Sequence, residues 1–401
     1  METVPALATR QQSIISSKTC PIRLFGSGGI LRGTLAEWCA EKGIGEEETL
    51  EIEYFESVMP PQRMSTLPHE DWVSSISCQI AGYFLTACYD GNIRAFDYSQ
   101  KLLQTIPTHN APVSSICIIP TPSAPSESHL IASASHDLTA RITRLTLTPD
   151  SSTASPPQTL ASLHLHTAPL SSISANSSGT HVLTSSWDGL IGVWNTSIPT
   201  IDEVPLDDTQ AGAERKRRRK MGDGDDAPRP RRKAPAAVLK SHTARVSKVV
   251  FGRAEQDKTA YSCGFDSTVR VWDVENEICT NTITASSKPF LDLALSPSGQ
   301  SALAASTDRT VSQYDLRAST SSAITPSVAT LAHPATPSCI AVSPDSSSEH
   351  QLITGAYDGV VRLWDLRSIK SAVTSFKAWE GKDVGKKVLS VDWARGGRRR
   401  R

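Results

Sequence analysis

Residues 352–368 read LITGAYDGVVRLWDLRS, and this stretch decides the fold. Two short runs of apolar and small side chains flank an Asp-Gly pair, which is a strong local signal for a β-hairpin. Thr354, Asp358 and Trp364 stand at fixed positions around the turn, and His333 lies a short way upstream. These residue types suit either a catalytic site or a structural chain of hydrogen bonds.

The hairpin pattern is written six times along the chain. The six copies read TACYDGNIRAFD, ASASHDLTARIT, TSSWDGLIGVWN, SCGFDSTVRVWD, AASTDRTVSQYD and TGAYDGVVRLWD, with turn aspartates Asp90, Asp137, Asp188, Asp266, Asp308 and Asp358. Successive aspartates lie 42 to 51 residues apart, except for one interval of 78. A period of about 40–45 residues is typical of a four-stranded propeller blade. One blade cannot bury both of its faces, so we expect the copies to stack in a ring.

The copies resemble WD40 repeats, the family of seven-bladed β-propellers, over residues 69–395. The family's structural tetrads map onto three blades: His166, Thr184, Asp188 and Trp194; His242, Ser262, Asp266 and Trp272; His333, Thr354, Asp358 and Trp364. Phe96, Thr143 and Tyr314 stand at the Trp position of the other three blades, which we expect to be held less tightly. The resemblance implies an all-β, seven-bladed propeller.

The seventh blade is expected to be incomplete. KKVLSVDWARGG, residues 386–397, resembles the first strand of a blade, and a basic tail at 396–401 follows. We favour a truncated or misread gene model at this end, because GGRRRR has no apolar residue to place. The alternative is a ring that closes imperfectly and exposes two strand edges.

A hydroxyl, an imidazole and a carboxylate could also form the triad of a hydrolase. Thr184, Ser262 and Thr354 would then be the nucleophiles. We favour the structural interpretation, because three copies of one active site around a ring are implausible and no G-x-S-x-G turn is present. The sequence has no phosphate-binding glycine loop and no His and Cys at metal-binding spacing, so we expect no enzyme activity, no cofactor and no intrinsic metal.

The amino-acid composition limits the cellular compartments in which we expect this protein. Among 401 residues, 41 Lys and Arg balance 41 Asp and Glu, so no overall field attracts nucleic acid or membrane. The eight cysteines form no C-x-x-C pair and the N-terminus lacks the apolar run of a secretion signal, which indicates a reducing cytosolic or nuclear compartment. No run approaches the roughly 20 apolar residues that cross a bilayer, and we expect no membrane partner.

The long interval contains a basic insertion, residues 200–238, between the third and fourth blades. Its charge, Gly and Pro predict a disordered surface loop. Two clusters suggest a two-part nuclear import signal: Arg215, Lys216, Arg217, Arg218, Arg219, Lys220, Arg231, Arg232 and Lys233. Direct RNA contact is a weaker expectation, since base-stacking aromatic residues are absent from the loop. The alternative is a solvated loop without a specific role.

The segment ahead of the ring reads differently. Residues 1–20 are unassigned, residues 21–57 read as half of a small α+β unit, and 58–68 form a linker. The stretches ILRGTLAEW, GIGEEETLEIEY, HEDWVSSI and VLSVDW resemble the WD-repeat ribosome-biogenesis factors of the PeBoW-type complex, the fungal Ytm family. That resemblance implies a partial ubiquitin-like domain at 21–57.

The same resemblance implies partners and a role. Members of the family form a complex with the pescadillo and block-of-proliferation homologues. Their ubiquitin-like domain is bound by midasin, an ATPase that removes assembly factors from pre-60S particles. Glu47 matches the residue that completes the magnesium shell of midasin, and Mg²⁺ prefers oxygen ligands; taken alone, Glu46 to Glu48 would read as a solvated loop.

We therefore expect a non-enzymatic assembly factor for the large (60S) ribosomal subunit, needed for pre-rRNA processing and located in the nucleolus and nucleoplasm. Its propeller is expected to dock the propeller of the block-of-proliferation homologue. The alternative is a WD40 substrate receptor of a ubiquitin ligase or a chromatin-binding scaffold.

Overall fold

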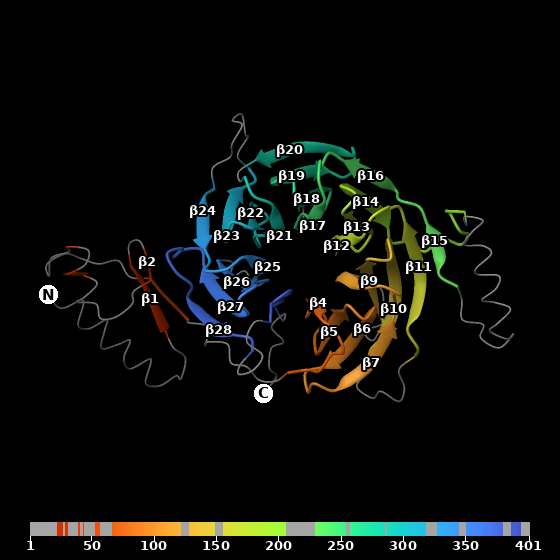
Figure 1. Ribbon diagram of the computed structural model, residues 1–401, viewed down its shortest axis with the longest axis horizontal. Helices are drawn as coiled ribbons and strands as arrows, with labels where there is room; N and C mark the ends of the chain where they lie inside the picture. The colour runs from red at the N-terminus through yellow and green to blue at the C-terminus, as the bar shows by residue number, and fades with distance from the viewer. Residues whose placement is uncertain are drawn as a thin grey trace.

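The computed structural model describes residues 22–26, 29–30, 39–40, 43, 53–56, 66–121, 128–148, 155–205, 229–253, 257–284, 287–317, 327–344, 350–379 and 386–393. These residues form a small N-terminal sheet and a β-propeller (Figure 1). The small sheet is antiparallel, with β1 (Ile22–Gly26) between β2 (Gly29–Ile30) and β3 (Glu53–Glu56). The ubiquitin-like identity of residues 21–57 stays a prediction.

Six sheets make up the propeller. The first blade contains β4 (Val73–Ser77), β5 (Tyr83–Cys88), β6 (Asn92–Asp97) and β7 (Leu102–Pro107). The second contains β8 (Val113–Ile119), β9 (Ser128–Ser135), β10 (Thr139–Thr146) and β11 (Gln158–His164). The third contains β12 (Leu170–Ala175), β13 (His181–Ser186), β14 (Leu190–Asn195) and β16 (Ala237–Lys240).

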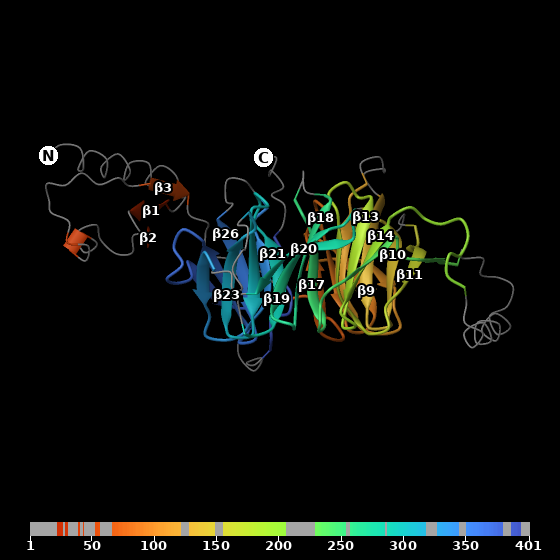
Figure 2. The same cartoon turned by 90° about the horizontal axis from the view of Figure 1, so that it is seen from above.

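The other three blades follow the same order. The fourth contains β17 (Val246–Phe251), β18 (Thr259–Gly264), β19 (Thr268–Asp273) and β20 (Ile278–Thr284). The fifth contains β21 (Phe290–Leu295), β22 (Ser301–Ser306), β23 (Thr310–Asp315) and β24 (Ala329–Ala332). The sixth contains β25 (Pro337–Val342), β26 (Gln351–Ala356), β27 (Val360–Asp365) and β28 (Thr374–Lys377). Figure 2 shows the ring from its edge, with the strands running between its two faces.

The hydrophobic core lies between blades. Each of five clusters combines buried side chains from two successive blades, from the first and second blades through to the fifth and sixth. A smaller sixth cluster joins Cys339 and Val361 of the sixth blade to Val388. Because apolar burial dominates folding free energy, each blade is stabilised mainly by its neighbours.

The prediction of seven blades was wrong, because the described residues form six. Residues 386–393 lie between β25 and β4 and form no strand. The Ser338 hydroxyl donates to the Val388 carbonyl, and the Ile76 N–H donates to Ser390 Oγ over 3.2 Å. A blade needs a second strand to complete the backbone ladder of its first, and the described chain places none beside this segment. The segment therefore links the sixth and first blades through individual hydrogen bonds.

Part of the basic insertion is ordered, which differs from the expected disordered loop. β15 (Arg231–Lys233) pairs in parallel with β11 at the outer edge of the second blade. Asp202 accepts a hydrogen bond from the Arg232 N–H over 2.9 Å, and Lys233 is buried with its Nζ donating to Ser197. The chain thus leaves the third blade, adds a strand to the second, and returns, because the edge of β11 offers unpaired backbone groups.

Among the residues that the structure describes, no helix is long and apolar enough to span a membrane.

Candidate functional site

A chain of hydrogen bonds joins Trp272 to Asp266 in the fourth blade. Trp272 Nε1 donates to Ser262 Oγ over 2.8 Å, Ser262 Oγ lies 2.6 Å from His242 Nε2, and His242 Nδ1 lies 2.8 Å from Asp266 Oδ2. The indole only donates and the carboxylate only accepts, so His242 donates from Nδ1. Burial raises the pKa of Asp266, but hydrogen bonds from His242 and Thr268 outweigh it and hold that pKa at about 2.

The third blade repeats this arrangement. Trp194 Nε1 donates to Thr184 Oγ1 over 2.8 Å, and His166 lies 2.8 Å from Thr184 Oγ1 and 3.1 Å from Asp188 Oδ2. The three Ser or Thr residues of the sequence-derived tetrads are fully buried. A nucleophilic hydroxyl needs an exposed position, so the geometry supports a structural role for these residues.

The sixth blade departs from the pattern. His333 Nε2 lies 2.9 Å from Thr354 Oγ1, which accepts from Trp364 Nε1 over 3.0 Å. His333 Nδ1, however, meets a backbone carbonyl, while Asp358 pairs with Arg362 over 2.6 Å. Burial lowers the pKa of His333 to about 4, and the charge of Arg362 contributes to this. The structure therefore joins three of these four predicted residues and engages Asp358 elsewhere.

Sequence reasoning missed a fourth site of this kind, in the second blade. His109 Nδ1 lies 2.8 Å from Asp137 Oδ2, and its Nε2 lies 2.8 Å from Ser133 Oγ. The signal was present, because the motif His-Asn-Ala-Pro that begins at His109 resembles His-Thr-Ala-Pro in the third blade. Thr143 in place of Trp hid it, and Thr143 Oγ1 is buried without a hydrogen-bond partner.

The residue immediately before the turn aspartate is aromatic in five of the six blades. These residues are Tyr89, His136, Trp187, Phe265 and Tyr357. The backbone N–H of each donates to a carbonyl in the loop that leads into the same blade, as Trp187 does to Pro169 over 3.0 Å. The equivalent hydrogen bond holds all five at the same end of their blades.

These five aromatic side chains surround the mouth of the central channel. They line one cavity of about 290 Å³, whose walls also include Leu291 of the fifth blade and Leu389 of the linking segment. All six blades therefore contribute to it. We call Trp72, Tyr89, His136, Trp187, Phe265, Tyr357 and Arg245 together the mouth surface.

The aromatic residues of the mouth surface pack in a continuous row along the first three blades. Ring centroids are 6.3 Å apart for Trp72 and Tyr89, 6.2 Å for Tyr89 and His136, and 5.5 Å for His136 and Trp187. Trp72 is nevertheless 60% exposed and Trp187 is 44% exposed. An exposed apolar patch on a well-ordered frame is typical of a binding surface.

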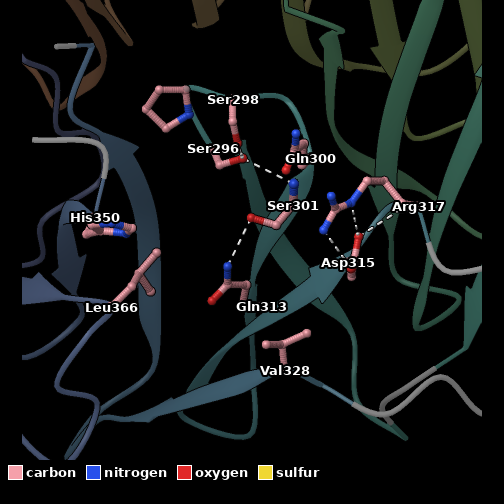
Figure 3. Close-up of a pocket in the computed structure, with 11 residues that line it drawn as sticks. Ser296, Ser298, Gln300, Ser301, Gln313, Asp315, Arg317, Val328, His350 and Leu366 are labelled. Atoms are coloured by element: carbon pink, nitrogen blue, oxygen red, sulfur yellow. Dashed lines mark hydrogen bonds and ion pairs between the residues drawn. The ribbon is translucent and has the colours of Figure 1, made fainter. Parts of the chain in front are cut away.

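A larger cavity, of about 480 Å³, lies at the opposite end of the fifth and sixth blades (Figure 3). Its polar side chains bond one another: Asp315 pairs with Arg317 over 3.3 Å, and Gln313 donates to Ser301 over 3.0 Å. Since these groups already have partners within the cavity, we consider the mouth surface the better candidate despite its smaller volume.

The other predicted site residues lie elsewhere. Glu47 and the basic run 215–220 fall outside the described residues. Within the parts of the chain that the structure describes, no group of three or more His, Cys, Asp or Glu residues is placed to hold a metal ion.

Comparisons with known proteins agree with the fold. The family described as "WD domain, G-beta repeat" matches residues 61–97, 100–143, 157–195, 233–273, 277–315 and 325–365. The chain is 59% identical over 381 residues to ribosome biogenesis protein YTM1 of Laccaria bicolor, covering 94% of this chain and 82% of that protein. Identity to the YTM1 protein of Coprinopsis cinerea is 54% over 385 residues, covering 95% and 83%. Identity to that of Saccharomyces cerevisiae is 30% over 404 residues, covering 94% and 84%. The chain therefore belongs to the YTM1 family of ribosome biogenesis proteins with WD40 repeats.

Proposed function

We propose that this chain is a non-enzymatic assembly factor for the large (60S) ribosomal subunit, needed for pre-rRNA processing in the nucleolus and nucleoplasm. Its relatives are named ribosome biogenesis proteins, and it aligns with more than four fifths of each relative compared above. A role in ribosome biogenesis follows from this kinship. The large subunit, the processing step and the compartment are the finer parts of the proposal.

The observation that carries a docking role is the mouth surface. Aromatic residues concentrate in the energetically dominant parts of protein interfaces. Here Trp72 and Trp187 expose large rings on turns whose backbone is fixed by hydrogen bonds, so little conformational entropy would be lost on binding. The proposed occupant is the propeller protein of the block-of-proliferation type, with the pescadillo homologue in the same complex.

The burial of the tetrad hydroxyls supports the non-enzymatic part of the proposal. The tetrad hydroxyls are buried and already bonded to Trp and His side chains. They stabilise blades and have no access to a substrate.

We propose that Glu47 offers its carboxylate to the magnesium site of midasin. The support is its place within Glu46, Glu47 and Glu48, shortly before β3, and the preference of Mg²⁺ for oxygen ligands. Glu47→Ala should abolish binding of midasin to the full chain, while Glu46→Ala serves as the matched control. Retention of midasin by Glu47→Ala would reject the assignment.

Nuclear import is proposed to rest mainly on the run 215–220. The second cluster contributes less in this proposal, because Lys233 is buried and the Arg232 N–H donates to Asp202. Replacing 215–220 with alanine in a fluorescently tagged chain should leave the protein in the cytoplasm, whereas Arg231→Ala should not. Nuclear accumulation without 215–220 would contradict the proposal.

The docking role is tested with Trp187→Ala, and Tyr98→Ala serves as control because Tyr98 is an exposed aromatic residue after β6, away from the mouth. Cells depending on Trp187→Ala should accumulate large-subunit pre-rRNA precursors, and the variant should capture less block-of-proliferation homologue. Normal processing and capture by a folded Trp187→Ala protein would reject the docking role.

A further inference from the structure

We propose that the channel mouth contains a carboxylate-binding site, formed by Arg245 and Lys387, that receives an acidic segment of the docked protein. The inference rests on the proposed docking role and adds the chemistry of the segment that enters the cavity.

Arg245 is held in place by its backbone and by aromatic side chains. Its carbonyl accepts the Phe265 N–H over 2.9 Å. Its guanidinium carbon lies 3.5 Å from the centroid of the Phe265 ring and 5.4 Å from that of Trp187. Contacts of this kind attract a cation to the face of an aromatic ring and leave the in-plane N–H donors available.

Within the described part of the chain, Arg245 forms no ion pair with a carboxylate. Among the described residues, none provides an oxygen within ion-pair distance of it, and the residues lining the cavity include no Asp or Glu. The aspartates of the two adjacent turns are engaged, since Asp188 bonds His166 and Asp266 bonds His242 and Thr268. The Arg245 guanidinium thus borders a cavity whose described lining includes no carboxylate.

A second cation lies at the same mouth. Lys387 Nζ is 4.9 Å from the centroid of the Tyr357 ring, and Tyr357 lines the same cavity as Arg245. The Asp71 carboxylate, next to Trp72, accepts the Trp72 N–H over 2.7 Å. Arg245 and Lys387 thus bring two positive charges to a cavity whose lining residues include no Asp or Glu.

The two positive charges and the volume of the cavity favour a carboxylate from a protein side chain as the ligand. A planar guanidinium can donate two parallel hydrogen bonds to one carboxylate, and such charge-assisted bonds are short and strong. A cavity of about 290 Å³ accommodates one or two side chains. RNA binding depends on neutralising many phosphates, whereas the proposed site consists of Arg245 and Lys387.

The test uses a fluorescein-labelled hexaglutamate peptide and the full chain, followed by fluorescence polarisation at low salt. The wild type should bind it, and Arg245→Met, which keeps the side-chain length and removes the charge, should weaken binding at least tenfold. Lys387→Met should weaken it several-fold. Lys240→Met is the matched control, because Lys240 is an exposed cation at the end of β16, and should bind like the wild type.

Three outcomes would overturn the inference: no binding of hexaglutamate to the wild type, equal binding by folded Arg245→Met, or tighter binding of a hexauridine oligonucleotide. Partner capture separates the two proposals. If Trp187→Ala loses the block-of-proliferation homologue while Arg245→Met captures it normally, docking stands and the carboxylate site fails. If Trp187→Ala captures it normally, the docking role itself fails.

Discussion

Replacing Asp266 with Asn measures how much one tetrad contributes to stability. The folded-state pKa of about 2 lies below the ordinary value of 3.8. At about 1.4 kcal/mol per pH unit, that difference corresponds to roughly 2–3 kcal/mol of free energy of unfolding at neutral pH. The Asp266 side chain is only 4% exposed, so solvent screening takes little from this figure. Urea unfolding at pH 7, followed by tryptophan fluorescence, should show a loss of this size.

The same substitution should change the response to acid. Because the folded-state pKa of Asp266 is depressed, its contribution is fully present above about pH 3.8 and is lost as the pH falls through about 2. Melting temperatures measured from pH 5 to pH 2.5 should therefore fall less steeply for Asp266→Asn than for the wild type. Parallel curves would refute the electrostatic part of the reasoning.

Asp358→Asn is the matched control in the sixth blade. Asp358 pairs with Arg362 and its side chain is 26% exposed, while His333 bonds a backbone carbonyl. The loss should therefore be smaller than for Asp266→Asn, on the order of 1 kcal/mol. Equal losses for the two variants would show that the Asp to His hydrogen bond is not what stabilises the fourth blade.

Three further substitutions probe ring closure and strain. Asp392→Ala removes the acceptor of the Cys78 N–H, 2.6 Å away, and should lower the free energy of unfolding by about 1–2 kcal/mol; an unchanged urea midpoint would contradict a closing role for residues 386–393. Asp292→Ala removes the acceptor of the Ile340 N–H, 2.7 Å away between two inner strands, and should lower the melting temperature, whereas an unchanged value would count against this link. Leu138→Gly should raise the urea midpoint by the equivalent of about 0.5–1 kcal/mol, because Leu138 has a φ of 69°, in the left-handed region that favours glycine. A lower midpoint would argue against backbone strain at this residue.

The hairpins were predictable because their signals are local. The Asp at each turn and the apolar alternation on either side act within about a dozen residues, and the observed strands β26 and β27 flank Asp358 as expected. The tetrads of the third and fourth blades followed from the resemblance to WD40 repeats, which the sequence carries in its His, Ser or Thr, Asp and Trp residues. That of the second blade was overlooked because recognition relied on Trp, which Thr143 replaces.

Other features depend on contacts between distant parts of the chain. Ser390 bonds Ile76 although the two residues are over 300 positions apart in the sequence. No local pattern specifies whether the segment around Ser390 gains a strand partner. The same holds for β15, where a basic run becomes a strand because the edge of β11 is available.

By itself, the sequence determined the repeat, the turns and the residues able to bond within one blade, since each depends on neighbours close along the chain. Only the tertiary structure decided how many blades the described residues complete and which side chains meet at the channel mouth. Tyr89, His136, Trp187, Phe265 and Tyr357 are single residues in five separate repeats. They form one surface because closing the ring brings equivalent turns to a common axis, where Arg245 borders a cavity whose described lining includes no carboxylate.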